Sequence, residues 1–111
     1  MAATNKQKPV LCKVNDRGQY IVSNLTRNDF RVIFYHLQPY KDILTRDHNE
    51  MMRLALLQEV YYKVAEIAFR HGRSLRFTKA QALAYHETFK YEQYVGHITH
   101  DIVCLINRKI V

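Results

Sequence analysis

The sequence has few of the residues that mark disordered, fibrous or disulfide-stapled proteins: three glycines, two prolines and two cysteines among 111 residues, and no tryptophan. It also lacks any apolar run near the roughly 18 residues that a membrane-spanning helix needs. Its hydrophobic content of 48% is normal and is enough for a globular core. The length suits one domain and is too short for two independent cores. We therefore expect a single soluble domain.

The N-terminal segment lacks the apolar stretch of about 7–15 residues that a secretory signal carries. We expect residues 1–8 to form a flexible basic tail and residues 9–111 to form the globular domain. The cysteines, Cys12 and Cys104, sit near opposite ends of the chain. A small secreted domain usually has more disulfides, so we expect two reduced, partly buried thiols in a cytoplasmic protein. One disulfide between them is the alternative.

Two short β-rich runs open the domain. They are Val10–Val14 and Gln19–Ser23, and the segment between them, residues 15–18, has the composition of a turn, with Gly18 suited to a positive φ. This pattern predicts a β-hairpin over Val10 to Ser23. A hairpin alone is marginally stable, so it must pack on other elements.

Threonine caps mark the starts of two predicted helices. Thr26 has Asp29 three residues later, and Thr78 has Gln81 at the same spacing, which is the pattern of a capping box. Pro39 should end the first helix at about residue 37 or 38, because the residue before a proline avoids the helical conformation.

The longest predicted helix begins near Asp47 and ends before Gly72. Its core stripe follows helical spacing and comprises Met51, Leu54, Leu57, Tyr61, Val64 and Ala68. The stretch after Gly96 is predicted to be a helix, with a strand as the alternative for its β-branched last residues. The expected fold is α+β, mostly α: an N-terminal β-hairpin packed on a small bundle of three to four helices.

Motifs for catalysis and cofactor binding are absent from the sequence. The glycines are too scattered for a phosphate-cradling loop, and no general acid and base can be paired from their spacing. His100 lies four residues before Cys104 and so on the same helix face, but the neighbours of Cys104 are apolar, which favours a buried, inert thiol. We expect a non-enzymatic protein without a cofactor.

Histidines provide one candidate metal site. His97, His100 and Asp101 could point the same way from a helix, and His86 or His36 could add a ligand. A site needs three or four converging ligands, which this spacing does not supply. We therefore expect a polar helix face and no metal.

Acidic residues are scarce: ten against 17 basic ones, giving a net charge of +7. Between Ile67 and His86 there is no acid, and a basic residue recurs at every third position. The free amides of Lys79, Ala80 and Gln81 at a helix start favour an anion. We predict a phosphate- or nucleic-acid-binding site formed by Arg70, Arg73, Arg76, Thr78 and Lys79. A second basic cluster lies near the N-terminus and comprises Lys6, Lys8, Lys13 and Arg17.

The eight tyrosines indicate a second possibility, because tyrosine is enriched at protein interfaces. The candidates for binding a partner are Tyr62, Tyr91 and Tyr94.

The sequence therefore leaves two hypotheses for the function. The first is a basic module that binds nucleic acid through phosphates with little sequence preference. The alternative is a protein-partner module, such as a subunit, an adaptor or an inhibitor, including one of phage or mobile-element origin. The sequence leaves the oligomeric state open.

Overall fold

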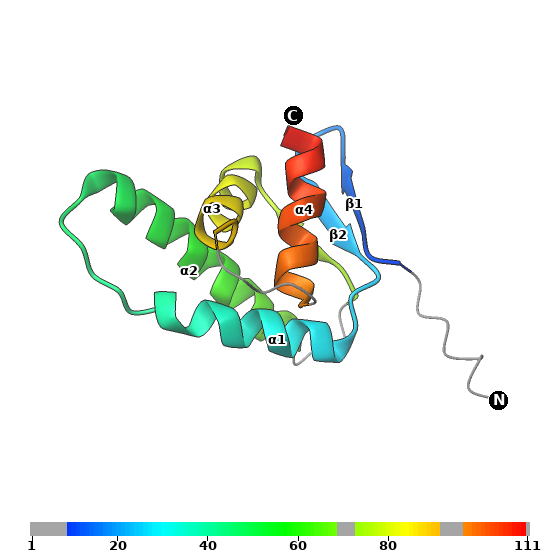
Figure 1. Cartoon of the computed structure of the whole chain (residues 1–111), viewed down its shortest axis with the longest axis horizontal. Helices are drawn as coiled ribbons and strands as arrows, with labels where there is room; N and C mark the ends of the chain where they lie inside the picture. Colours follow the sequence, from blue (N-terminus) through cyan, green and yellow to red (C-terminus); the bar gives the residue numbers. More distant parts are fainter. Residues whose placement is uncertain (1–8, 69–72, 92–96, 111) are drawn as a thin grey trace.

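The computed structural model describes residues 9–68, 73–91 and 97–110. These residues form a mostly helical α+β fold, which confirms the predicted class (Figure 1). The predicted flexible tail, residues 1–8, lies outside the described residues. The elements in chain order are β1 (Leu11–Val14), β2 (Tyr20–Ser23), α1 (Arg27–Leu37), the 3₁₀ turn η2 (Gln38–Tyr40), α2 (His48–Ala68), β3 (Leu75–Phe77), α3 (Lys79–Phe89) and α4 (Ile98–Ile110).

The N-terminal hairpin is confirmed, and its turn is held as the sequence suggests. The Asn15 side-chain oxygen accepts hydrogen bonds from the amides of Arg17 and Gln19, at 3.0 and 2.9 Å, and Gly18 adopts a φ of 74°. Such a φ is readily available to glycine and strained for most other residues.

A third strand, β3, completes the sheet and was not predicted. It pairs antiparallel with β2, so the strand order is β1-β2-β3. Cys12, Val22 and Leu75 lie side by side across the three strands, and all three are buried. Because side chains alternate along a strand, these residues define the inner face of the sheet.

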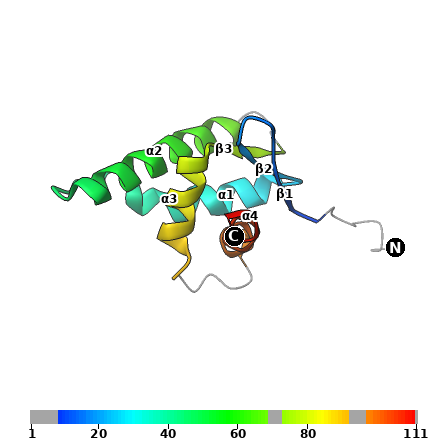
Figure 2. The same ribbon diagram turned by 90° about the horizontal axis from the view of Figure 1, so that it is seen from above.

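Helices cover this inner face. α4 packs beside β1 and the other helices extend away from the sheet, as two perpendicular views show (Figures 1 and 2). The hydrophobic core contains side chains from all three strands and from the four α-helices. Its largest fully buried side chains are Tyr85, Phe30, Phe77, Phe89, Ile33, Leu37, Leu57, Leu75, Ile102 and Ile106, with Val22 and Val60.

Both capping boxes are present. The Thr26 hydroxyl accepts from the Asp29 amide while the Asp29 carboxylate accepts from the Thr26 amide, at 3.1 and 2.9 Å. α1 ends at Leu37, as Pro39 predicted. α4 stays helical to Ile110, so the strand alternative for the last described residues is wrong.

The predicted stripe of α2 is only partly correct. Leu54, Leu57 and Val64 are buried, but Met51 is 48% exposed. Met51 lies in the first turn of α2, at the end of the molecule away from the sheet, where fewer elements are available to cover it (Figure 1). The predicted cap at Gly72 lies outside the described residues.

A buried polar pair ties α1 to α4. His36 Nδ1 and Thr99 Oγ1 are 2.5 Å apart, and both residues are buried. Burial lowers the pKa of His36, and the nearby His97 lowers it further. The neutral imidazole is therefore the form that the folded protein favours.

We expect the folded protein to lose stability at acidic pH, because acid protonates His36. Because its pKa is lower folded than unfolded, its contribution to stability is complete above the unfolded value of about 6.5 and is lost as the pH falls below it. Urea unfolding at about pH 7 and about pH 5 should show a lower free energy of unfolding at pH 5. His36→Gln should reduce this difference, whereas His48→Gln, at an exposed position, should preserve it. An unchanged pH difference in His36→Gln would contradict the assignment.

None of the described helices combines the length and the apolar character that crossing a membrane requires.

Candidate nucleic-acid interface

The outer face of the sheet brings together two basic clusters that are far apart in the sequence. Lys13 pairs with Ile21, and Ile21 pairs with Arg76, so the three side chains form a row across the strands. Lys13 and Arg76 are exposed. With strands about 4.8 Å apart, their Cα atoms are separated by about 10 Å. Two positive charges therefore flank one apolar side chain on an open face.

The outer face carries no acid on the three strands. Its residues are Leu11, Lys13, Ile21, Ser23 and Arg76. It carries no aromatic side chain either, so it lacks the stacking platform that single-stranded nucleic acids use. The face is therefore suited to charge contacts with a phosphate backbone.

Lys63 of α2 reaches the free edge of β3, and sequence reasoning missed it. Its ammonium donates to the Arg76 carbonyl at 2.6 Å and to Gln81 Oε1 at 3.1 Å. Burial lowers the pKa of Lys63, while Glu59 raises it and Arg76 lowers it. Lys63 therefore fixes the β3–α3 junction and adds a basic group there. No spacing rule could reveal it, because the contact depends on β3.

The start of α3 corrects one detail of the predicted anion site. The Thr78 hydroxyl accepts from the Gln81 amide at 3.1 Å, so this amide is already satisfied. The amides of Lys79 and Ala80 have no acceptor in the described part of the chain. Two donors, and not three, are therefore oriented outward at this helix start.

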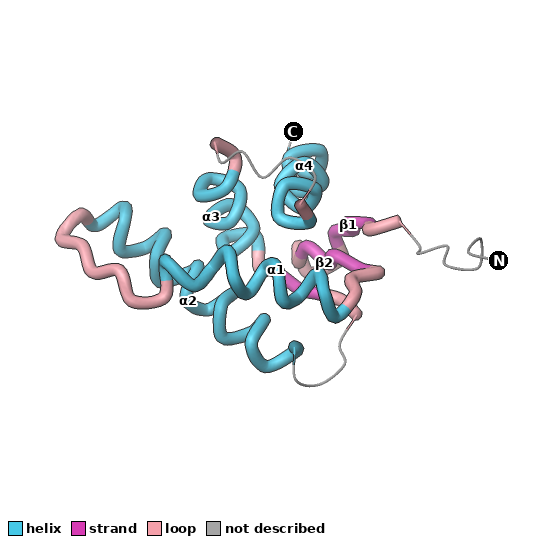
Figure 3. Tube along the Cα trace, turned by 60° about the horizontal axis from the view of Figure 1, so that its bottom comes forward, coloured by secondary structure: helices cyan, strands magenta, loops and turns pink. Residues whose placement is uncertain are grey.

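Arg73 lies next to this junction. Its backbone carbonyl accepts from the Leu25 amide at 2.9 Å, which anchors the segment before β3, while its side chain is exposed. Of the predicted set, the structure brings Arg73, Arg76, Thr78 and Lys79 together at β3 and the start of α3. Figure 3 shows the strands β1 and β2 at one end of the molecule. Arg70 lies outside the described residues.

Two acids flank this basic surface: Asp16, in the hairpin turn after β1, and Glu59, at the β3–α3 junction. The Glu59 carboxylate accepts from the Gln81 side-chain amide at 3.1 Å, on the α2 side of the junction. Its negative charge therefore acts on Lys63 first.

We call the outer-face residues Lys13, Ile21 and Arg76, together with Arg73 and Lys79, the basic face. Comparison of the chain with protein-family models, curated proteins and solved structures finds no match. The fold and this surface are therefore the basis for assigning a function.

The tyrosines of the predicted partner-binding site do not lie together in the structure. Tyr62 is 64% exposed on the second half of α2, and Tyr91, 81% exposed, follows the end of α3. The hydrogen bond between Arg53 and Thr88 shows that the end of α3 lies beside the start of α2, so these two tyrosines are at opposite ends of the helix pair. Tyr94 lies outside the described residues.

The histidines are distributed over separate contacts. His36 pairs with Thr99, His86 Nε2 lies 3.1 Å from Asn107 Oδ1, and His100 contacts Cys104. Among the described residues, no group of three histidine, cysteine or acidic side chains is placed to hold a metal ion.

The environment of Cys104 differs from the one expected. The residue is half-buried, its Sγ lies 3.5 Å from His100 Nε2, and both line a cavity of about 380 Å³ with Arg108. Cys104 is thus partly buried, as expected for the two thiols, but its apolar neighbours in sequence do not enclose it, because this side of α4 faces an open cavity. Cys12 is buried, and burial raises the pKa of its thiol.

The two thiols are expected to react at different rates. A disulfide reagent such as Ellman's reagent should modify Cys104 in the folded protein at least about tenfold faster than Cys12, because only an accessible thiolate reacts. Single-cysteine variants, Cys12→Ser and Cys104→Ser, separate the two rates. Equal rates without denaturant would contradict the burial of Cys12.

Proposed function

We propose that this protein is a small non-enzymatic module that binds nucleic acid through the phosphate backbone, using the basic face. The observation that carries the proposal is the row of Lys13, Ile21 and Arg76. It joins an N-terminal basic residue to the Arg73–Lys79 stretch on a face that carries no acid on its strands. Basic side chains spaced along an open surface are the electrostatic footprint of a nucleic-acid binder.

Contacts of this type give affinity with little sequence preference. Phosphate contacts position a protein on nucleic acid, whereas hydrogen bonds to base edges read the sequence. The exposed groups of the basic face are long cations, one aliphatic side chain and two backbone amides. They match phosphate oxygens and lack the amide side chains that commonly read adenine.

Direct binding tests this proposal. Fluorescence anisotropy should show comparable dissociation constants for unrelated duplexes of equal length at low salt. Four phosphate contacts, from Lys13, Arg73, Arg76 and Lys79, predict a slope of about −3 to −4 for log affinity against log salt. Single-stranded DNA and RNA serve as the comparison ligands. No measurable affinity for any of them at low salt would refute the proposal.

A protein-partner module is the second candidate, because apolar side chains are exposed at the end of the molecule away from the basic face. Leu44 is 93% exposed there, and Met52 is 68% exposed. We place either module in the cytoplasm, which is consistent with the two cysteines remaining free.

A further inference from the structure

The first half of α2 carries apolar side chains on three of its sides. Leu54 and Leu57 face the core and are buried. Met52 and Leu56 line a groove on one flank, and Met51, with Ala55, lines a second groove on the other. A helix that is apolar around most of its circumference is normally buried. In this chain the outward side of α2 is left uncovered.

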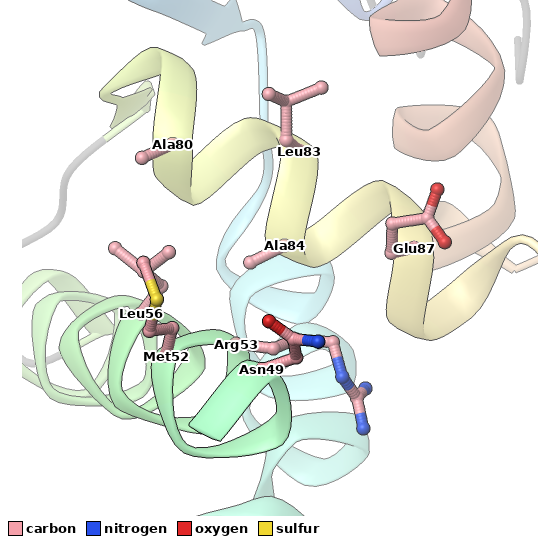
Figure 4. Close-up of a pocket in the computed structure, with 8 residues that line it drawn as sticks. All are labelled: Asn49, Met52, Arg53, Leu56, Ala80, Leu83, Ala84 and Glu87. Atoms are coloured by element: carbon pink, nitrogen blue, oxygen red, sulfur yellow. The ribbon is translucent and has the colours of Figure 1, made fainter. Parts of the chain in front are cut away.

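The first groove lies between α2 and α3 and has a volume of about 320 Å³. Met52 and Leu56 extend from α2 toward Ala80 on α3, and Ala84 lies farther along (Figure 4). The small alanines leave the groove open. Met52, 68% exposed, is a flexible side chain that adapts readily to an apolar contact.

The second groove, of about 180 Å³, lies on the other flank of α2 and is lined in part by Leu44 and Met51. Leu44 is 93% exposed, so its apolar side chain projects from the surface. The loop between η2 and α2, which carries Leu44, lies with the start of α2 at the end of the molecule opposite the sheet (Figure 1). We call residues 41–56 the arm.

The charge of the arm differs from that of the rest of the chain. The arm holds three basic and three acidic residues, whereas the whole chain has a net charge of +7. Its charged groups are also partly paired: Arg53 with Glu50, and Lys41 with Asp42 at 3.9 Å. The arm is therefore the nearly neutral, apolar end of a strongly basic molecule.

We infer that two copies of this chain associate through their arms, with apolar surface against apolar surface, in a two-fold symmetric dimer. A two-fold interface sets the same patch of each copy against its counterpart, so a charged patch would repel itself, and the arm does not. The arm also carries both projecting side chains, such as Leu44, and grooves that accept them, as a self-complementary surface requires. The sheets, whose outer faces carry Lys13, Ile21 and Arg76, lie at the far ends and stay open (Figure 1).

This inference does not depend on nucleic-acid binding, and the two respond differently to salt. Phosphate contacts weaken steeply as salt rises, whereas an apolar contact between neutral surfaces changes little. Dimerisation is measured on the protein alone, so either proposal can fail without the other.

Sedimentation velocity of the whole chain over a range of concentrations, up to about 100 μM, tests the dimer. Wild-type protein should shift from monomer to dimer, and the shift should persist at moderate salt. Met52→Glu or Leu44→Glu should weaken association at least about tenfold, because each places an uncompensated charge in the apolar contact. Both positions are exposed, so the variants should fold, and circular dichroism checks this.

Tyr35→Glu is the matched control, since Tyr35 is 75% exposed on α1, outside the arm. It should dimerise as the wild type does. A wild-type protein that stays monomeric at every concentration would overturn the inference. So would a dimer that Met52→Glu and Leu44→Glu leave unchanged, because the interface would then lie elsewhere.

Discussion

Leu57→Ala is expected to lower the free energy of unfolding by about 2–5 kcal/mol. Leu57 is 1% exposed and lies in the core, on the side of α2 that faces the other helices. Truncation removes buried apolar surface and leaves a cavity that the surrounding side chains fill only partly. Urea denaturation, followed by circular dichroism, measures the change.

Leu44→Ala provides the control, because it makes the same chemical change at a position that is 93% exposed. Its free energy of unfolding should stay within about 0.5 kcal/mol of the wild-type value, at a concentration where the protein is monomeric. Equal losses from the two substitutions would contradict the burial of Leu57.

Replacing both Arg73 and Arg76 by alanine is expected to weaken binding to every nucleic-acid sequence about equally. It should also flatten the salt slope by about two units, one for each lost phosphate contact. The double variant should keep the wild-type stability, because both side chains are exposed. Anisotropy titrations at several salt concentrations, on two unrelated duplexes, measure affinity and slope together.

The control variant also loses two arginines, but at positions outside the basic face. Arg46 and Arg108 are exposed, one in the arm and one near the end of α4. Their double alanine variant lowers the net charge equally but leaves the basic face intact, so its salt slope should stay close to the wild-type value. If both double variants flatten the salt slope equally, nucleic-acid binding depends on the net charge of the protein. The contact is then not localised to the basic face.

The sequence predicted the elements whose signals are local. Both threonine caps, the hairpin turn and the end of α1 at Pro39 depend on residues within a few positions of each other, and all four are confirmed. Most of the described buried residues of the predicted α2 stripe also followed from periodicity, as Leu57 and Val64 show. Each of these features can be recognised without knowing what packs against it.

The strand β3 could not be predicted because it depends on long-range pairing. Its three residues, Leu75–Phe77, are too few to show a period, and among the described residues their strand partner is β2, more than 50 positions earlier. The missing strand had a consequence for the site. No predicted helix or strand contained Arg76, whereas the sheet sets it across Ile21 from Lys13.

Errors in predicted burial have a different cause. Met51 has the spacing of a core residue and Cys104 has apolar neighbours in sequence, yet Met51 is exposed and Cys104 is half-buried. A helix pattern shows which residues share a face, but not how far the neighbouring elements extend along it. That information comes only from the packing of the whole chain.

The location of the nucleic-acid contact is the central claim, and amide chemical-shift mapping by NMR tests it most directly. During titration of the ¹⁵N-labelled protein with a short duplex, the account predicts that shift changes concentrate on Lys13, Ile21, Arg76 and Lys79. The arm, represented by Met52, should change little. Changes centred on the arm, with the basic face unmoved, would contradict the account.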